Sequence, residues 1–434
     1  MNYREGFVDF LNKSSSTYHA VSEVERQLIE AGFIKLKENT TWILENNRYY
    51  YVVKNQSSLI AFKIPEIANV KSVNIIVSHS DSPSLKIKPV ADIKDEHYNR
   101  INVEIYGGAL LSTWLDKPLG IAGRVTVKEN EALTSKLVDF EKDMAIIPNV
   151  AIHQNSAAND GYKWDKQTDL VPIMGLKPTE DYFNNLLSKK LLVRKEDIMA
   201  HDLHFYNRQK AILWGEDQEF ISGGKLDNLE SVYTSLQAFL SGYSKNSLNV
   251  LGIFDHEEIG SRTKQGMASN FLSDVIERVF NSFYYVNSDI KAILANSFLV
   301  SADNGHAVHP NHPEMYDSTS QSFLNKGVVI KTSAAQRYVS DSITIAIAKE
   351  LCHKAEIPYQ LFANRNDSRG GATQAAAGSV HLPINMVDVG LAQLAMHSTY
   401  ETCGSYDVDY MIKFMLEFYN STITVDDNRY FVTK

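Results

Sequence analysis

The chain has 434 residues, with 43 basic and 52 acidic side chains, a formal net charge of −9 and two cysteines. The length predicts two domains, or one domain with a large insertion. An acidic balance without a basic run argues against a nucleic-acid partner, and two cysteines are too few for a disulfide framework, so we expect a reducing compartment.

The chain shows no segment typical of secretion or membrane insertion. Residues 1–6 contain an acid and no apolar run, unlike a secretory signal. No stretch approaches the roughly 18 consecutive apolar residues that a membrane span requires. We therefore expect a cytoplasmic protein without a membrane partner.

The first 80 residues change from a helical pattern to a strand pattern. Apolar residues at helical spacing over 5–32, interrupted by serines at 14–16, predict two helices. Residues 49–53, 58–62 and 73–78 predict strands, the first two joined by a hairpin turn at 54–57. The third strand is followed by His79 and Asp81, so polar chemistry lies at a strand end.

Residues from about 88 to 222 predict a mostly β insertion. Strand-like pieces at 101–106, 119–127 and 144–152 alternate with turns rich in glycine, proline and asparagine. A long polar loop covers residues 154–167. We assign the inserted β-rich domain to residues 89–221.

Helix and strand patterns alternate through the rest of the chain. Helices are predicted at 227–240, 268–283, 340–354, 372–378 and 411–419, and strands at 248–254, 292–301, 328–331, 360–363 and 384–389. Helices between strands imply a parallel or mixed sheet covered on both faces. The predicted fold class is α/β, with a mixed central sheet flanked by helices in a domain formed by residues 1–88 and 222–434.

The stretch 255–261 concentrates charge at the end of a predicted strand. Four titratable residues follow an apolar run directly and precede a turn. One interpretation places Glu257 and Glu258 in the first turn of a helix, where they would offset the helix dipole. The other assigns one glutamate to a metal ion and its neighbour to proton transfer, which requires partners elsewhere in the chain.

Residues suited to metal binding also follow other predicted strands or turns: His79, Asp227, Asp303 and His397. Each alone has an ordinary explanation, such as an N-cap for Asp227. Together with the glutamate pair they meet the needs of two zinc ions about 3.5–4 Å apart, which share one carboxylate and a water. A carboxylate that is not a ligand must then accept the proton of the water. Asp81 would hydrogen-bond the far nitrogen of the His79 imidazole.

Other hydrolase and nucleotide-binding signatures are absent. The zincin pattern of two histidines on one helix is broken at Gly260, where the second histidine would stand. Gly-x-Ser-x-Gly and Walker loops do not occur. Serine-hydrolase and nucleotide chemistry therefore have no support.

Five segments in combination resemble one family: 78–83, 225–229, 255–261, 301–311 and 393–398. The family is the aspartyl aminopeptidase and vacuolar aminopeptidase I group of dinuclear zinc exopeptidases. Residues 106–125 are similar to the motif of its insertion domain, and the resemblance runs in order over about 15–420. It implies peptide substrates, two divalent metal ions per subunit, with Zn²⁺ expected, and a homododecamer built from dimers, with 89–221 as the dimerisation domain.

The resemblance also implies a role for each residue of the cluster. Its metal ligands would be His79 and Asp303 on one zinc ion, Glu258 and His397 on the other, and Asp227 as the bridge between them. Glu257 would act as general base, with Asp81 beside it. His153, in the insertion, would reach the active site of a neighbouring subunit and help to stabilise the tetrahedral intermediate.

Acidic specificity in the family is attributed to a lysine and a tyrosine that correspond to Lys331 and Tyr338. Residues 366–375 depart from the family pattern near the specificity side, so a broader preference is an alternative. A related dizinc deacylase or carboxypeptidase, and a scaffold protein without catalysis, are the rival functions. The histidines at 306, 309 and 312 are interpreted as loop and core residues rather than as a further metal site.

Overall fold

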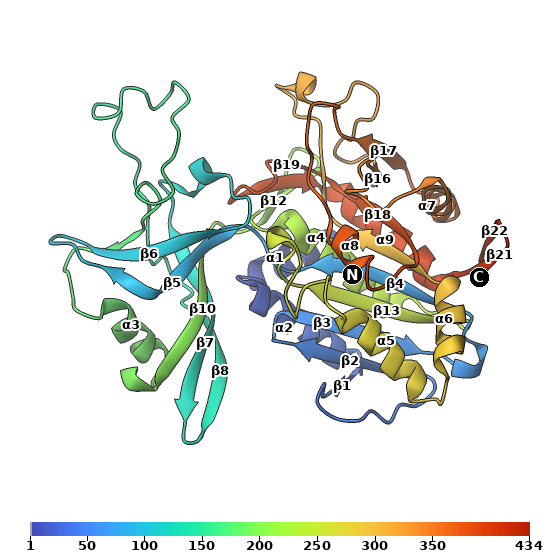
Figure 1. The fold of residues 1–434 in the computed structure, drawn as a ribbon. Coiled ribbons are helices and arrows are strands. Elements are labelled where there is room, and N and C mark those ends of the chain that lie inside the picture. The colour runs from blue at the N-terminus through green and yellow to red at the C-terminus, as the bar shows by residue number, and fades with distance from the viewer. Residues whose placement is uncertain (1) are drawn as a thin grey trace.

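The computed structural model, which describes residues 2–434, is built around a nine-stranded mixed sheet in the order β1-β2-β3-β13-β4-β14-β18-β16-β17 (Figure 1). Its strands are β1 (Ile34–Leu36), β2 (Arg48–Lys54), β3 (Ser58–Ile64), β4 (Ser72–His79), β13 (Ser247–Phe254), β14 (Phe298–Ala302), β16 (Val328–Thr332), β17 (Tyr359–Ala363) and β18 (Asn385–Gly390). β13, β4, β14 and β18 are parallel neighbours. Their carboxyl ends therefore meet at one edge of the sheet.

Helices cover both faces of this sheet. One face packs against α1 (Tyr3–Lys13), α2 (Thr17–Glu30), α4 (Leu226–Ser241), α7 (Ser342–Lys354) and α9 (Ser405–Asn420). The other packs against α5 (Phe271–Asn281), α6 (Asn287–Ala295) and α8 (Gln374–Gly378). Along β13, Leu251 and Ile253 enter the first core, whereas Leu248 and Val250 enter the second, as the strand pleat requires. The predicted α/β fold with helices on both faces is confirmed.

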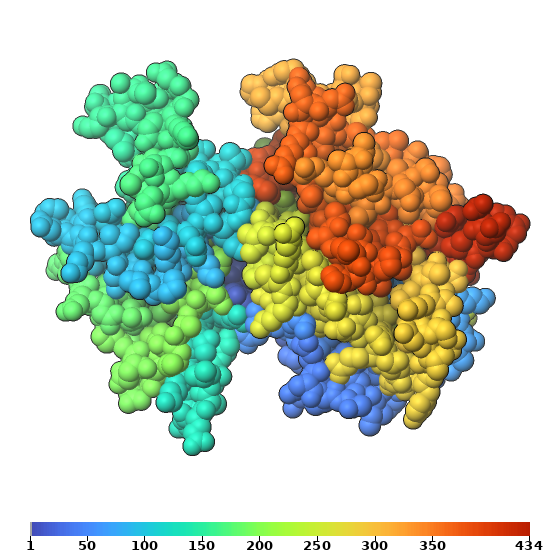
Figure 2. Space-filling view, in the orientation of Figure 1, coloured from blue at the N-terminus to red at the C-terminus, as the bar shows by residue number. Residues whose placement is uncertain are grey.

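A separate antiparallel sheet of six strands, in the order β8-β7-β10-β5-β6-β9, lies beside the first (Figure 1). Its strands are β5 (Ser84–Ile93), β6 (Asn99–Tyr106), β7 (Leu119–Glu129), β8 (Ala132–Asp139), β9 (Ile173–Gly175) and β10 (Ile198–Asn207). α3 (Tyr182–Leu191) adds Phe183 and Leu187 to its core. The two parts form lobes that meet at a waist (Figure 2). The β-rich region is thus present, and its role in dimerisation and the boundaries at 88 and 222 stay predictions.

Two smaller sheets complete the fold. A five-stranded sheet joins β11 (Ile212–Trp214), β12 (Phe220–Gly223), β20 (Glu401–Gly404), β19 (Ala392–Leu394) and β15 (Gly305–His306), in that order. A hairpin of β21 (Thr422–Asp426) and β22 (Arg429–Thr433) follows α9. The five-stranded sheet brings the start of α4 close to the turn after β19.

One predicted strand is wrong, and a second begins later than predicted. Residues 144–152 form only isolated bridges, because Pro148 lacks an N–H group and Asn149 donates its backbone and side-chain N–H groups to the Asp116 carboxylate. Residues 292–295 end helix α6, and β14 begins only at Phe298. A short apolar run fits a buried helix as well as a strand, so periodicity did not separate the two.

The structure also describes the two cysteines and the lengths of the apolar helices. Cys352 and Cys403 are buried free thiols. Over the described residues 2–434, no helix combines the length and the apolar character that crossing a membrane requires.

Candidate active site

The candidate residues gather where β4, β13 and β14 end. His79 is the last residue of β4, the glutamate pair follows β13, and Asp303 follows β14. Asp227 lies in the first turn of α4, and His397 lies in the turn after β19. The parallel strands therefore place residues that are far apart in the sequence at one edge, as predicted.

Asp227 lies between two pairs of side chains. Its Oδ1 is 3.4 Å from Nε2 of His79, which is 3.8 Å from Oδ1 of Asp303. Its Oδ2 is 3.5 Å from Nε2 of His397, which is 3.4 Å from Oε2 of Glu258. Two atoms that each lie ~2.1 Å from a tetrahedral zinc ion are ~3.4 Å apart. The spacing thus suits one ion beside each pair.

Two buried oxygens of the cluster, Asp227 Oδ1 and Glu258 Oε1, have no hydrogen-bond partner among residues 2–434. His79, Asp227 and Glu258 offer ligand atoms that lie within 4.8 Å of one another. Buried carboxylates are costly unless they are paired, hydrogen-bonded or bound to a metal. Since zinc accepts imidazole and carboxylate ligands, the donor set fits divalent zinc.

The electrostatics of the cluster favour an added positive charge. Burial, reinforced by Asp227, raises the pKa of Glu258 well above its usual value, and burial raises the pKa of Glu257 to about 8. Burial opposes protonation of His79 and His397, but neighbouring carboxylates outweigh it and raise both pKa values, that of His397 to about 10. A divalent cation would offset the repulsion between the carboxylates and displace these protons.

Backbone carbonyls orient both imidazoles. Nδ1 of His79 lies 3.1 Å from the carbonyl oxygen of Asp81, and Nδ1 of His397 lies 3.0 Å from that of Gly108. A carbonyl only accepts, so each Nδ1 carries the proton and each Nε2 is free to bind a metal ion. The Asp81 carboxylate lies near the same nitrogen, with its Oδ1 3.5 Å from Nδ1 of His79, so its predicted role in fixing this tautomer stays a prediction.

The Asp81 carboxylate holds the backbone of the glutamate pair. It accepts the N–H groups of Glu257 and Glu258, each at 3.1 Å, and the Tyr106 hydroxyl at 2.6 Å. The segment Glu257–Ile259 is a single 3-10 turn, and α5 begins only at Phe271. The helix N-terminus interpretation therefore holds for one turn only, and Asp81 is the anion that caps it.

A cavity of about 390 Å³ opens over the cluster. It is lined by the predicted residues Asp227, Glu257, Glu258, Asp303, Lys331, Tyr338 and His397. His79 and Asp81 are buried behind this wall, with 1% and 4% of their surface exposed. His153 is exposed on a loop of the β-rich region and does not line the cavity. A single chain thus brings together every predicted site residue except His153.

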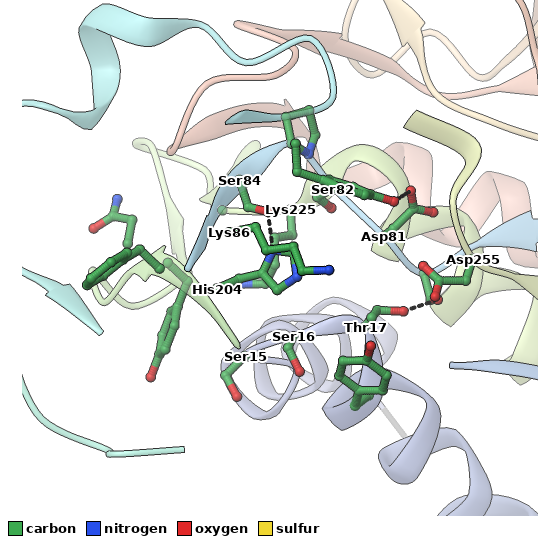
Figure 3. A pocket seen from close by; sticks show the side chains of 18 of the residues that line it. Ser15, Ser16, Thr17, Asp81, Ser82, Ser84, Lys86, His204, Lys225 and Asp255 are labelled. Atoms are coloured by element: carbon green, nitrogen blue, oxygen red, sulfur yellow. Dashed lines mark hydrogen bonds between the residues drawn. The ribbon is translucent and has the colours of Figure 1, made fainter. Parts of the chain in front are cut away.

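A second cavity, of about 180 Å³, lies between the two lobes (Figure 3). Ser15 and Ser16 line it from the turn between α1 and α2, and Lys86 and His204 line it from the six-stranded sheet. Asp81 borders it, but none of the candidate metal ligands does. The candidate metal ligands other than the buried His79 therefore face the cavity of about 390 Å³ and not this one.

Three neighbours of the cluster were not predicted as site residues. Tyr106 contacts Asp81, and Glu401 accepts the N–H groups of Asp227 and His397. Gly107 has φ +73°, and a Cβ there would lie 3.1 Å from the Cβ of Glu258. The motif at 106–108 is visible in the sequence, but nothing in it indicates an approach to the cluster. Glu401 has no sequence signal at all.

Known proteins resemble this chain over nearly its whole length. The profile of peptidase M18, the aminopeptidase I zinc metalloprotease family, matches residues 10–419. The chain is 42% identical over 428 residues to a probable M18 family aminopeptidase 2 of Clostridium acetobutylicum, covering 97% of this chain and 99% of that protein.

Solved structures show the same fold. Ape4 in a cryo-EM structure of its complex with Nbr1 matches with a TM-score of 0.92 at 33% identity, over 96% of this chain and 85% of that chain. The S. cerevisiae mApe1 dodecamer matches with a TM-score of 0.83 at 28% identity, over 96% of both chains. The chain therefore belongs to the peptidase M18 family of aminopeptidase I zinc metalloproteases.

Proposed function

We propose that this zinc aminopeptidase removes an N-terminal aspartate or glutamate from peptides at a dinuclear site. The observation that carries the proposal is the position of Asp227, whose two oxygens face two different ligand pairs. His79 and Asp303 would hold one ion, and Glu258 and His397 the other. A zinc pair supplies an activated water and polarises the scissile carbonyl.

Glu257 is the proposed general base. Its side chain is 14% exposed, lines the cavity and lies 4.0 Å from Nε2 of His79. Glu257 takes a proton from the attacking water and returns it to the leaving amine nitrogen. Asp81 fixes the backbone of this residue through the bond to its N–H group, which keeps the carboxylate at the cavity wall.

His153 is proposed to complete the site of a neighbouring subunit by stabilising the oxyanion. Its exposed position on the β-rich lobe leaves it available to a second chain. The related S. cerevisiae mApe1 forms a dodecamer. A homododecamer built from dimers is accordingly the proposed assembly.

Lys331 and Tyr338 are proposed to bind the acidic side chain of the substrate. The Lys331 ammonium is buried in the cavity wall, 5.1 Å from the centre of the Tyr338 ring. It donates to the carbonyl oxygens of Asp303 and Asn304, at 2.8 and 3.4 Å. An ammonium has three N–H donors, so one remains for a substrate carboxylate.

A broader preference is the second candidate. It is favoured by the two backbone bonds of Lys331, which give this ammonium a structural task. Kinetics on Asp-, Glu-, Leu- and Lys-amides, with Lys331→Ala in parallel, separate the two candidates. Acidic specificity requires higher kcat/KM for the acidic amides and the loss of this advantage in the variant. Equal rates in the parent would leave an aminopeptidase without acidic preference.

The glutamate pair provides the sharpest test of the mechanism, because two adjacent residues have opposite expected outcomes. Glu257→Gln should bind zinc like the parent and lose at least about 100-fold in kcat, the low end for a general base. Glu258→Gln should lose zinc. Zinc is measured by metal analysis after gel filtration and turnover by amide hydrolysis. Equal zinc loss in both variants would make Glu257 a ligand and refute its assignment as base.

A further inference from the structure

Glu401 is a buried carboxylate outside the predicted ligand set, with 2% of its surface exposed. Its Oε1 accepts the backbone N–H of His397 at 2.7 Å, and its Oε2 accepts the backbone N–H of Asp227 at 3.2 Å. We propose that Glu401 is a positioning residue that holds Asp227 and His397 at the separation required for zinc. This inference rests on the proposed ligand roles of those two residues.

The strand order explains how one side chain reaches both segments. β20, which begins with Glu401, lies between β12 and β19 in the five-stranded sheet. β12 leads into α4 and Asp227, and Gly223 at its end is the register partner of Glu401. β19 leads into the turn that carries His397. Glu401 therefore lies between the two segments that lead from β12 and β19 to the cluster.

Both N–H groups belong to irregular backbone. His397 has φ +67° and Ala395 has φ +57°, a left-handed conformation that is unfavourable for a non-glycine residue. Asp227 has non-helical φ and ψ inside the first turn of α4. The left-handed conformation of His397 persists only where the surroundings hold it. The Glu401 carboxylate supplies that restraint from one rigid strand.

The partners of Glu401 argue against a role in charge pairing. Among residues 2–434, it bonds to the two N–H groups and, at 3.4 Å, to the Gln393 side-chain amide, and to no lysine or arginine. A buried carboxylate without a cation is unfavourable. An apolar side chain would avoid this cost, so the two N–H bonds are the distinctive contribution of Glu401.

Asp81 shows the same arrangement for another segment of the cluster. It accepts the N–H groups of Glu257 and Glu258, as Glu401 does for Asp227 and His397. Both carboxylates border the second cavity. Two buried carboxylates thus fix the backbone of three proposed ligands and the proposed base.

Asp407 is a matched control for a purely structural role. It is fully buried, and its carboxylate accepts the backbone N–H groups of Asn325 and Gly327, at 2.6 and 2.8 Å. It contacts none of the proposed ligands. Loss of Asp407 should therefore lower the melting temperature without changing zinc affinity.

The test compares Glu401→Gln, Glu401→Asp, Asp407→Asn and His397→Ala in the full-length protein. After removal of metal, zinc Kd is measured by competition with a chromophoric chelator, and the melting temperature of the apoprotein is recorded. Both Glu401 variants should bind zinc about 10- to 100-fold more weakly, as for other residues that orient ligands. Glutamine offers only one acceptor, and aspartate is too short to reach both N–H groups. Asp407→Asn should stay within about twofold of the parent.

Each result has a defined meaning. Parent-like zinc affinity in both Glu401 variants would overturn the positioning role, provided that His397→Ala loses zinc. Parent-like affinity in His397→Ala would instead refute the ligand assignment of the proposed function. If neither Glu401 variant folds while Asp407→Asn does, Glu401 is a stability residue and the inference is also overturned.

Discussion

The Tyr106 hydroxyl links the β-rich lobe to the proposed catalytic glutamates. It donates to Oδ2 of Asp81 at 2.6 Å, and Asp81 in turn accepts the N–H groups of Glu257 and Glu258 at 3.1 Å. Tyr106→Phe removes this hydroxyl and keeps the ring, including its edge contact with His204. The variant therefore tests whether the β-rich lobe helps to hold the backbone of Glu257 and Glu258.

The expected effect follows from the bonds that remain. A hydrogen bond to a charged group contributes about 1.5–3 kcal/mol. Oδ2 of Asp81 keeps the N–H of Glu258, so no oxygen is left unsatisfied and the loss should be near the lower value, about 1.5 kcal/mol. If half to all of this loss appears in the transition state, kcat/KM falls roughly 4- to 12-fold.

The assay is amide hydrolysis at saturating zinc for the parent, Tyr106→Phe and Tyr206→Phe. Tyr206 is a matched control, because its hydroxyl also donates to an aspartate, Asp139, at 3.0 Å. Asp139 does not line the catalytic cavity, so Tyr206→Phe should keep kcat/KM within about twofold. Unchanged kcat/KM in Tyr106→Phe, with melting temperatures lowered equally in both variants, would refute the coupling.

Three further predictions concern stability and metal binding. Lys63 is buried and donates to the carbonyls of Leu240 and Gly242 at the end of α4, and burial lowers its pKa from 10.5 to about 8. Since the folded pKa is the lower one, the unfolded chain binds more protons between these values, and stability rises with pH across this window. In urea unfolding, the free energy of unfolding of the parent should rise by up to ~3 kcal/mol relative to that of Lys63→Met between pH 7.5 and 10.5. A difference between the two proteins that does not change with pH would contradict the lowered pKa of Lys63. Gly107→Ala should weaken zinc binding in chelator competition, because φ +73° is strained for alanine and its Cβ would lie 3.1 Å from the Cβ of Glu258; parent-like affinity would show that the turn adapts. Removal of zinc by chelation should abolish turnover and lower the melting temperature. The free energy of unfolding should fall by about 4 kcal/mol if free zinc was 1,000-fold above Kd. Full activity without metal would exclude the dinuclear site.

Local patterns in the chain were sufficient for most of the fold. The period of the apolar residues predicted α1, α2, α4 and α7, and β-branched runs predicted β2, β3, β4 and β13. The failures lie at 144–152 and 292–297, where short apolar runs carry too few turns or alternations to separate helix, strand and loop. Tertiary packing decided those segments.

The cluster itself was visible because chemical type and position coincide. Polar residues after apolar strands stand out in the sequence, and parallel strands bring their carboxyl ends together. His79, Glu258 and Asp303, which lie at the ends of β4, β13 and β14, therefore could be grouped before any distance was known. The role of the Asp81 carboxylate could not be predicted from the sequence, because it depends on which N–H groups the 3-10 turn presents.

What the sequence by itself determined is the inventory: an α/β core with a mixed sheet, a β-rich insertion, and residue types able to hold two zinc ions. Only the tertiary structure decided which residues position the side chains of the cluster. Glu401, Tyr106 and Gly107 act through backbone N–H groups, a hydroxyl and a close approach between segments distant in the chain. Such contacts leave no periodicity or spacing in the sequence, because they depend on the relative placement of sheets rather than on neighbouring residues.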